Sequence, residues 1–169
     1  MITYRDALPT DGPELDAMAQ KIWMEVFGET APPADIAAYR AKAYGPEGAL
    51  IRELGDPERP VHIALDDGAI VGYTKLIPPF LPDPEPGALQ LSQIYVASSH
   101  HGAGIAKVLM DWTADEARRR GAAALLLTVW ENNHRARAFY DKLGWVHVGD
   151  YGFQVGEQID TDHILRLAL

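Results

Sequence analysis

The 169-residue sequence contains no cysteine, and this absence removes several kinds of chemistry at once. Without thiols the chain can form no disulfide, no thiolate metal site and no cysteine nucleophile. Long apolar runs are also missing, so no stretch approaches the length that a membrane-spanning helix needs. The first residues are charged early and lack the apolar centre of a signal peptide, so the sequence predicts a cytoplasmic protein.

Positive charge is scarce as well, because 15 Lys and Arg residues stand against 24 Asp and Glu residues and leave a net charge of −9. That balance argues against nucleic acid and against an anionic membrane as the partner. The three arginines at 118–120 end an expected helix, where cations complement the helix dipole. The hydrophobic content of 47% suffices for a sizeable core, and we expect a single domain over residues 1–169.

Hydrophobic periodicity predicts strands and helices over most of the chain. Strands are expected at 2–7, 61–65, 69–76, 88–97, 123–130, 145–155 and 163–169, with helices near 10–28, 32–45, 46–54, 105–120 and 132–143. Residues 158–162 are expected to connect the last two strands. Five prolines within 78–86 preclude regular structure there and indicate an extended loop, which is either solvated or a wall of a substrate site.

A strand, a glycine-rich turn and a helix follow one another from residue 88 to residue 120. The turn contains Gly102 and Gly104, and residues at helical spacing then continue from Ile105 through Val108, Leu109, Trp112 and Glu116. Glycines at a helix N-terminus let backbone amides approach an anion, and the helix dipole favours phosphate there. The turn lacks the Gly-Lys-Ser/Thr of a Walker loop, and Lys107 stands where the dinucleotide fingerprint needs its third glycine. By spacing alone, a pyrophosphate site and a purely structural turn are therefore equally supported.

A second pattern, at the next strand–helix junction, makes the interpretation specific. It consists of Val129, Asn133, Ala136 and Tyr140 before Gly144-Trp145. Together with the turn, this pattern resembles the GCN5-related N-acetyltransferase (GNAT) superfamily, whose coenzyme A motif reads Arg/Gln-x-x-Gly-x-Gly/Ala. Gly104 and Ala106 match that motif, whereas His101 departs from it. Because the family holds the coenzyme pyrophosphate mainly with backbone amides, His101 is expected to weaken or alter binding rather than abolish it.

The resemblance implies a fold and a coenzyme. The fold is α/β of the α+β kind, with a mixed, mostly antiparallel, twisted central sheet of about six to seven strands, flanked by helices and splayed between the fourth and fifth strands. The implied cosubstrate is acetyl-CoA, with no metal. The residues expected to bind it are Ile94, Tyr95, Val96, His101, Gly102, Ala103, Gly104, Ile105, Ala106, Lys107, Asn133, Ala136 and Phe139.

The resemblance also implies catalytic roles. Tyr140 would be the general acid that protonates the departing coenzyme A thiolate, although a tyrosine on an amphipathic helix ordinarily only packs. Glu131, at a strand end, is the first candidate for the general base, but it equally suits the N-terminus of the following helix. Weaker candidates are Glu85, Asp150 and His147, and a base acting through ordered water is also left open. The histidines at 100, 101, 134 and 163 lack the spacing of a metal site, so none is predicted.

Within the superfamily, residues 93–96, 153–156 and 161–164 are similar to PaiA-type polyamine and diamine N-acetyltransferases. This similarity implies that the chain acetylates a primary amine of a small molecule, with a polyamine as the candidate. A protein N-terminus, an amino acid or an antibiotic would be acetylated by the same chemistry. A non-catalytic acyl-CoA-binding regulatory module is the alternative from another class, and a homodimer is left open.

Overall fold

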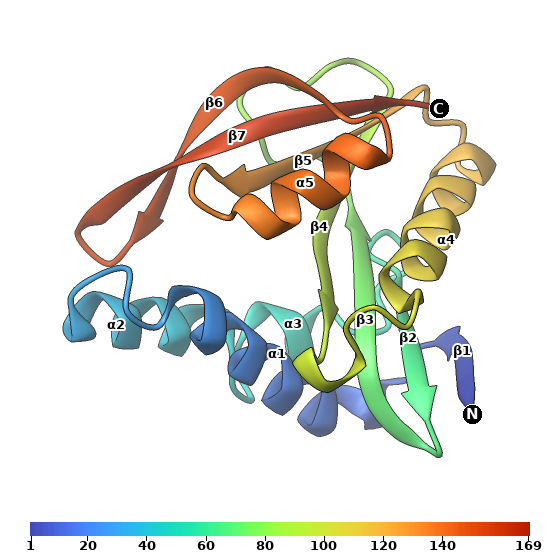
Figure 1. Ribbon diagram of the computed structural model, residues 1–169, viewed down its shortest axis with the longest axis horizontal. Helices are drawn as coiled ribbons and strands as arrows, with labels where there is room; N and C mark the ends of the chain where they lie inside the picture. Colours follow the sequence, from blue (N-terminus) through green and yellow to red (C-terminus); the bar gives the residue numbers. More distant parts are fainter.

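A computed structural model describes all 169 residues, and seven of its strands form one sheet (Figure 1). The strands are β1 (Ile2–Asp6), β2 (Val61–Asp66), β3 (Ala69–Ile77), β4 (Ala88–Val96), β5 (Ala124–Trp130), β6 (Val146–Val155) and β7 (Gln158–Ala168). The helices are α1 (Gly12–Phe27), α2 (Pro33–Ala43), α3 (Ala49–Arg52), α4 (Ile105–Arg119) and α5 (His134–Lys142). None of these helices combines the length and the apolar character needed to cross a membrane.

The sheet has the order β1-β2-β3-β4-β5-β7-β6, and every pair of neighbours is antiparallel except β4 and β5. This parallel pair is short, because only Ala88–Gln90 of β4 lie opposite residues of β5. Beyond Gln90 the two strands diverge, and Figure 1 shows β4 running away from β5 at a steep angle. The expected mixed, mostly antiparallel sheet with a splay between its fourth and fifth strands is therefore confirmed.

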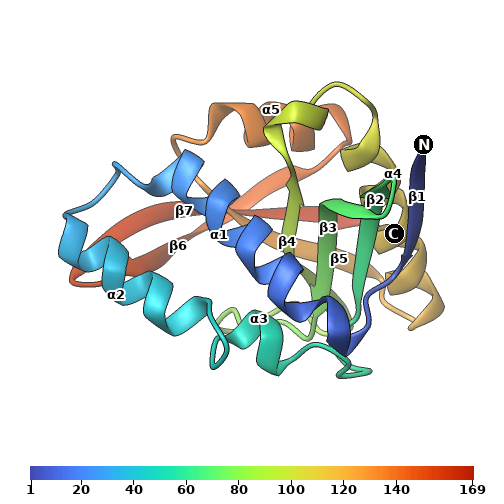
Figure 2. The same cartoon turned by 90° about the horizontal axis from the view of Figure 1, so that it is seen from below.

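Helices cover both faces of the sheet, α1 and α2 on one side and α4 and α5 on the other (Figures 1 and 2). On the first side Leu15 and Trp23 of α1 belong to one cluster of buried side chains with Tyr73 of β3. On the other side Met110 of α4 and Tyr140 of α5 belong to a second cluster of buried side chains around β5.

The buried face of α4 includes Ile105, Leu109 and Glu116, as the spacing predicted, but it departs from the prediction at two positions. Val108, placed inward by the spacing, is 42% exposed, and Trp112 instead stacks on His62 of β2 with ring centroids 4.4 Å apart. The inward face carries the polar residue Thr113, whose hydroxyl lies 2.7 Å from the hydroxyl of Thr74. The spacing of apolar residues cannot predict that Thr113 is buried. A buried hydroxyl needs a hydrogen-bond partner, and here that partner comes from a distant strand.

The expected connection at 158–162 is also wrong, since β7 already begins at Gln158. Gly156, with φ of 61°, turns the chain so tightly that Val155 pairs with Gln158. Residues 158–162 are mostly polar and give no apolar alternation, but β6 pairs with them throughout. The longer strand places Asp162 directly opposite Trp130 of β5, at the rim of the splay.

Candidate active site

The splay between β4 and β5 opens into a cavity of about 610 Å³. Its lining comes from α1 and α2 on one face of the sheet, from α4 and α5 on the other, and from the strands between them. The predicted site residues in this lining are Ile94, Tyr95, Val96, His101, Ala106, Asn133, Ala136, Phe139 and Tyr140. Two motifs that lie far apart in the sequence therefore meet in one cavity.

The glycine turn exposes unpaired backbone amides at the start of α4. Gly102 and Gly104 have φ of 83° and 80°, and no atom lies within 4 Å of where a side chain would begin. The amides of Gly102, Gly104, Ile105 and Ala106 donate no hydrogen bond within the chain. Free amides at the positive end of a helix are the standard partners of a phosphate group. The turn therefore fits the pyrophosphate of coenzyme A.

His101 connects three elements next to this turn. Its Nε2–H donates to the carbonyl oxygen of Val96 at 2.9 Å, so Nδ1 is left as an acceptor. Arg135 of α5 donates to that Nδ1 from Nη1 at 2.6 Å. His101, which departs from the family motif, thus positions the guanidinium of Arg135 beside the free amides of the turn.

Arg135 is a candidate that the sequence patterns did not identify, although one signal was present. The first turn of α5 contains no acidic residue and instead has His134, Arg135 and Arg137. Cations at a helix N-terminus oppose the helix dipole, so a bound anion would relieve an unfavourable arrangement. Arg137 is already used within the chain, because it donates to the carbonyl oxygen of Glu131 at 2.6 Å. Arg135 remains the guanidinium that faces the cavity.

Tyr140 lies on the side of α5 that faces the splay. The residue is 8% exposed, and its ring packs on Phe139 and Trp145 at centroid distances of 5.5 and 5.8 Å. Its hydroxyl forms no hydrogen bond within the chain, although the residue lines the cavity. Burial raises the pKa of the phenol above its ordinary value, so Tyr140 keeps its proton at neutral pH. Asn133 supports this position by capping α5, where its side-chain oxygen accepts from the amide of Ala136 at 3.3 Å.

Asp162 of β7 is a second candidate that sequence patterns missed, because it stands in the segment expected to be a connection. It is 6% exposed and lines the cavity. Burial raises the pKa of its carboxyl to about 7, and the charges of Asp160 and Glu131 act in the same direction. A hydrogen bond with Thr128 opposes them. A carboxyl that titrates near neutral pH can take up and release a proton under working conditions.

Several predicted residues lie outside the cavity lining. Glu131 is half-buried at the end of β5, where its amide donates to the carbonyl oxygen of Thr161 at 3.0 Å. Glu85 pairs with Arg166 at 2.5 Å, and Lys107 pairs with Asp111 at 2.5 Å. The other residues outside the lining are Gly102, Ala103, Gly104, Ile105, His147 and Asp150. For the residues of the turn this is no obstacle, because backbone amides and not side chains would face the ligand.

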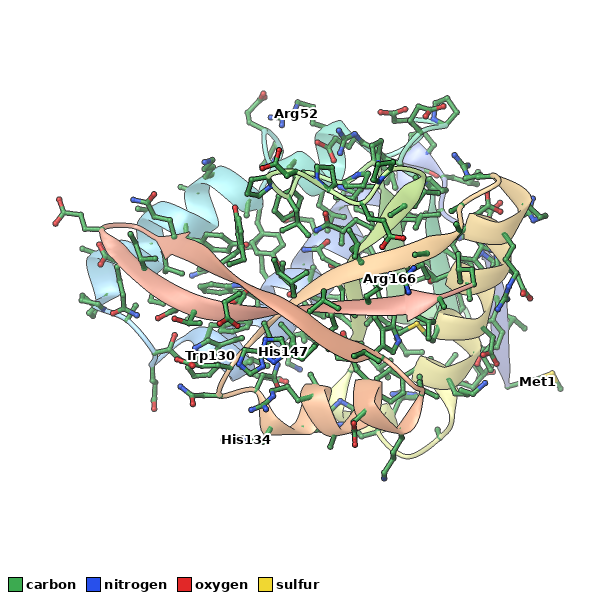
Figure 3. All side chains as sticks on the ribbon, turned by 90° about the horizontal axis from the view of Figure 1, so that it is seen from above. Met1, Arg52, Trp130, His134, His147 and Arg166 are labelled. Carbon is green, nitrogen blue, oxygen red and sulfur yellow. The ribbon has the colours of Figure 1, made fainter.

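The remainder of the cavity is aromatic and acidic. Four aromatic rings follow one another along it. The ring centroids of Trp23 and Tyr39 are 4.7 Å apart in a stack, those of Trp23 and Phe27 are 5.3 Å apart, and those of Phe27 and Trp130 are 5.7 Å apart. The carboxylates in the lining are Glu25, Asp160 and Asp162. No lysine lines the cavity, and its one arginine, Arg135 of α5, is bonded to His101 beside the glycine turn. Figure 3 shows Trp130 at the end of β5, close to the start of α5.

Comparisons with known proteins lead to acetyltransferases. The profile of the family described as the Acetyltransferase (GNAT) family matches residues 17–145. An uncharacterized N-acetyltransferase of Mycobacterium tuberculosis is 32% identical over 156 residues, which span 92% of this chain and 96% of that protein. Another, from the pepI 3′ region of Lactobacillus delbrueckii, is 29% identical over 161 residues, with 94% and 92% of the two chains covered. The PaiA N-acetyltransferase of Thermoplasma acidophilum, solved in complex with coenzyme A, superposes with a TM-score of 0.78 at 17% identity, covering 100% of this chain and 99% of that one.

Proposed function

The chain belongs to the acetyltransferase (GNAT) family and is an acetyl-CoA-dependent N-acetyltransferase, and from this premise we propose that its acceptor is a small aliphatic diamine or polyamine. One observation supports this acceptor above others: the charges of the cavity are separated by sign. The cation Arg135 stands beside the glycine turn, whereas the acidic residues Glu25, Asp160 and Asp162 come from α1 and β7. The basic end suits the phosphates of the coenzyme, and the acidic end suits a cationic acceptor.

The aromatic wall strengthens the case for an alkyl ammonium compound. A methylene chain can pack on Trp23, Phe27 and Trp130, and an ammonium group over such faces gains about 0.5–2 kcal/mol from cation–π attraction. An acceptor with its own carboxylate, such as a free amino acid, would bring a negative charge toward Asp160 and Asp162. The resemblance of residues 153–156 and 161–164 to PaiA-type enzymes points to the same class of acceptor.

Two side chains of the cavity account for the proton transfers. Bound acetyl-CoA supplies the acetyl group and a thiolate leaving group. Asp162 accepts a proton from the substrate ammonium, which leaves a neutral amine able to form the new C–N bond. Tyr140 donates its proton to the sulfur as the C–S bond breaks, and it regains a proton that the new amide nitrogen releases. Glu131 then acts indirectly, since its charge helps to keep the pKa of Asp162 high.

A panel of acceptors tests this assignment. We expect kcat/KM for 1,4-diaminobutane and spermidine to exceed that for butylamine by about tenfold or more. Their second ammonium group can bind near a carboxylate, and a stabilisation of about 1.4 kcal/mol there is enough for a tenfold difference. Asp160→Asn should narrow this preference without removing acetylation of butylamine. A preference for amino acids or for peptides with a free N-terminus would contradict the proposed acceptor and leave the acetyltransfer chemistry intact.

We further propose that Arg135 supplies the cation that the family motif ordinarily places at the position of His101. Arg135→Ala should raise the KM for acetyl-CoA by about ten- to a hundredfold, since a charge-assisted hydrogen bond contributes about 1.5–3 kcal/mol. The value of kcat should change little, because the guanidinium lies at the turn and not at the thioester. Steady-state kinetics with acetyl-CoA as the varied substrate measures both.

A shortened donor makes this test specific. Acetyl-pantetheine has no pyrophosphate, so Arg135→Ala should leave its kcat/KM unchanged if Arg135 binds phosphate. Arg118→Ala removes an exposed arginine at the far end of α4 and serves as the matched control. Equal losses with the two donors would show instead that Arg135 acts through the position of His101 or of α5.

A further inference from the structure

A second cavity, of about 450 Å³, lies between α5 and the hairpin of β6 and β7. It shares no lining residue with the acetyltransfer cavity. His134 and Asp141 of α5 line it together with His147 of β6 and His163 of β7. Figure 3 shows His147 on the side of the hairpin along which α5 runs, with His134 at the start of that helix. Three imidazoles in one small cavity have no part in the chemistry described above.

The pairing of β6 with β7 brings three metal-binding side chains to one place. Asp150 lies directly opposite His163, and ligand atoms of His147, Asp150 and His163 all lie within 4.8 Å of one another. The imidazoles of His147 and His163 stack with centroids 4.0 Å apart, and Nε2 of His147 lies 2.9 Å from Oδ1 of Asp150.

An irregularity in β6 makes this arrangement possible. Residues three apart on a regular strand point to opposite faces, so His147 and Asp150 would ordinarily be separated by the sheet. The register between β6 and β7 shifts between His147 and Gly149, which makes Val148 an extra residue. A β-bulge of this kind re-aims the side chains on one side of it, and bulges are often found beside functional sites.

We propose that His147, Asp150 and His163 bind a divalent transition metal of the zinc class. Two imidazoles and one carboxylate are a ligand set that suits Zn²⁺, with a fourth position left open. The side chains of His147 and Asp150 are 47% and 62% exposed, so small rotations can bring the ligand atoms to metal-binding distance. His134 and Asp141 line the same cavity as His147 and His163. The one guanidinium of the lining, Arg137, is held by the carbonyl oxygen of Glu131.

Binding of Zn²⁺ to untagged, full-length protein tests the proposal. Isothermal titration calorimetry should show about one equivalent of Zn²⁺ bound at micromolar or lower Kd, and Co²⁺ should give the visible absorption of a low-coordinate site. Zn²⁺ should also raise the Tm of the wild type, whereas Mg²⁺ should not, since it prefers oxygen ligands.

Variants decide which residues are the ligands. His163→Ala should weaken Zn²⁺ binding about tenfold or more, and Asp150→Asn, which preserves the shape of the hairpin, should do the same without loss of folding. His100→Ala removes a half-buried histidine that pairs with Asp66 and does not line this cavity, and this variant should bind like the wild type. Two outcomes would overturn the proposal. One is stoichiometric binding that survives both His163→Ala and Asp150→Asn. The other is no binding by the wild type at 100 µM Zn²⁺, which would mean a binding free energy weaker than about −5.5 kcal/mol.

Discussion

Replacing Tyr140 by phenylalanine is expected to lower kcat by about 10²–10⁴-fold, the usual contribution of a positioned general acid. The KM for acetyl-CoA should stay close to that of the wild type, because the proton is needed only when the C–S bond breaks. The substitution is conservative in structure: the ring keeps its packing on Phe139 and Trp145, and the lost hydroxyl had no hydrogen-bond partner in the chain. Circular dichroism and thermal unfolding should therefore match the wild type.

The leaving group provides a sharper test of the same role. When the acetyl donor is a thioester of an acidic aryl thiol, the leaving group is a stable thiolate that needs little protonation. The deficit of Tyr140→Phe should shrink strongly with such a donor and remain large with acetyl-CoA. Because burial raises the pKa of Tyr140, no loss of activity from its ionisation should occur below its ordinary pKa. Full activity of Tyr140→Phe across the pH range would remove the residue from the mechanism.

Replacing Asp162 by asparagine is expected to cause the other large loss, about 10²–10⁴-fold in kcat/KM at neutral pH. In the wild type kcat/KM should rise with pH and level off above about 7, since the pKa of Asp162 is raised to about 7 and a base must be deprotonated. The asparagine variant should lack this limb. Its deficit should shrink above about pH 9, where free amine becomes abundant in solution, because the pKa of an alkyl ammonium is near about 10.4.

Asp160→Asn is the matched control for Asp162. The charge of Asp160 helps to raise the pKa of Asp162, so removing this charge should shift the rise of kcat/KM with pH to lower pH. The rise itself should persist. Identical pH profiles for the wild type and Asp162→Asn would assign the base elsewhere, with Glu131 next to be tested.

The raised pKa of Asp162 should also make the stability of the protein depend on pH. The folded state holds the proton of Asp162 more tightly than the unfolded state, whose carboxyl titrates near about 3.9. This contribution to stability is complete below the unfolded pKa and is lost as the pH rises through about 7. Above that pH the wild type buries a charge that Asp162→Asn does not, so the variant should unfold at a higher temperature there and at the same temperature near pH 4. A less active but more stable variant would separate catalysis from folding.

Local patterns were sufficient for the parts of the site that are continuous in the chain. The strand, turn and helix around Gly102 and Gly104 follow from short-range rules, because positive φ, helix capping and apolar spacing involve neighbouring residues. Short-range rules also account for Asn133, which caps α5, and for Tyr140, which lies on the inner side of that helix. The family resemblance of these two motifs indicated the splayed sheet.

Residues whose importance depends on a distant partner could be found only in the folded molecule. Asp162 stands in a polar segment without apolar alternation, and pairing with β5 is what buries it and raises its pKa. Arg135 and His101 are 34 positions apart, and the register shift at Val148 that aligns His147 with Asp150 depends on β7. The sequence alone thus determined the glycine turn. The position of Arg135 beside that turn, the burial of the proposed base Asp162 and the second cavity were decided only by long-range packing, because they depend on burial and strand register.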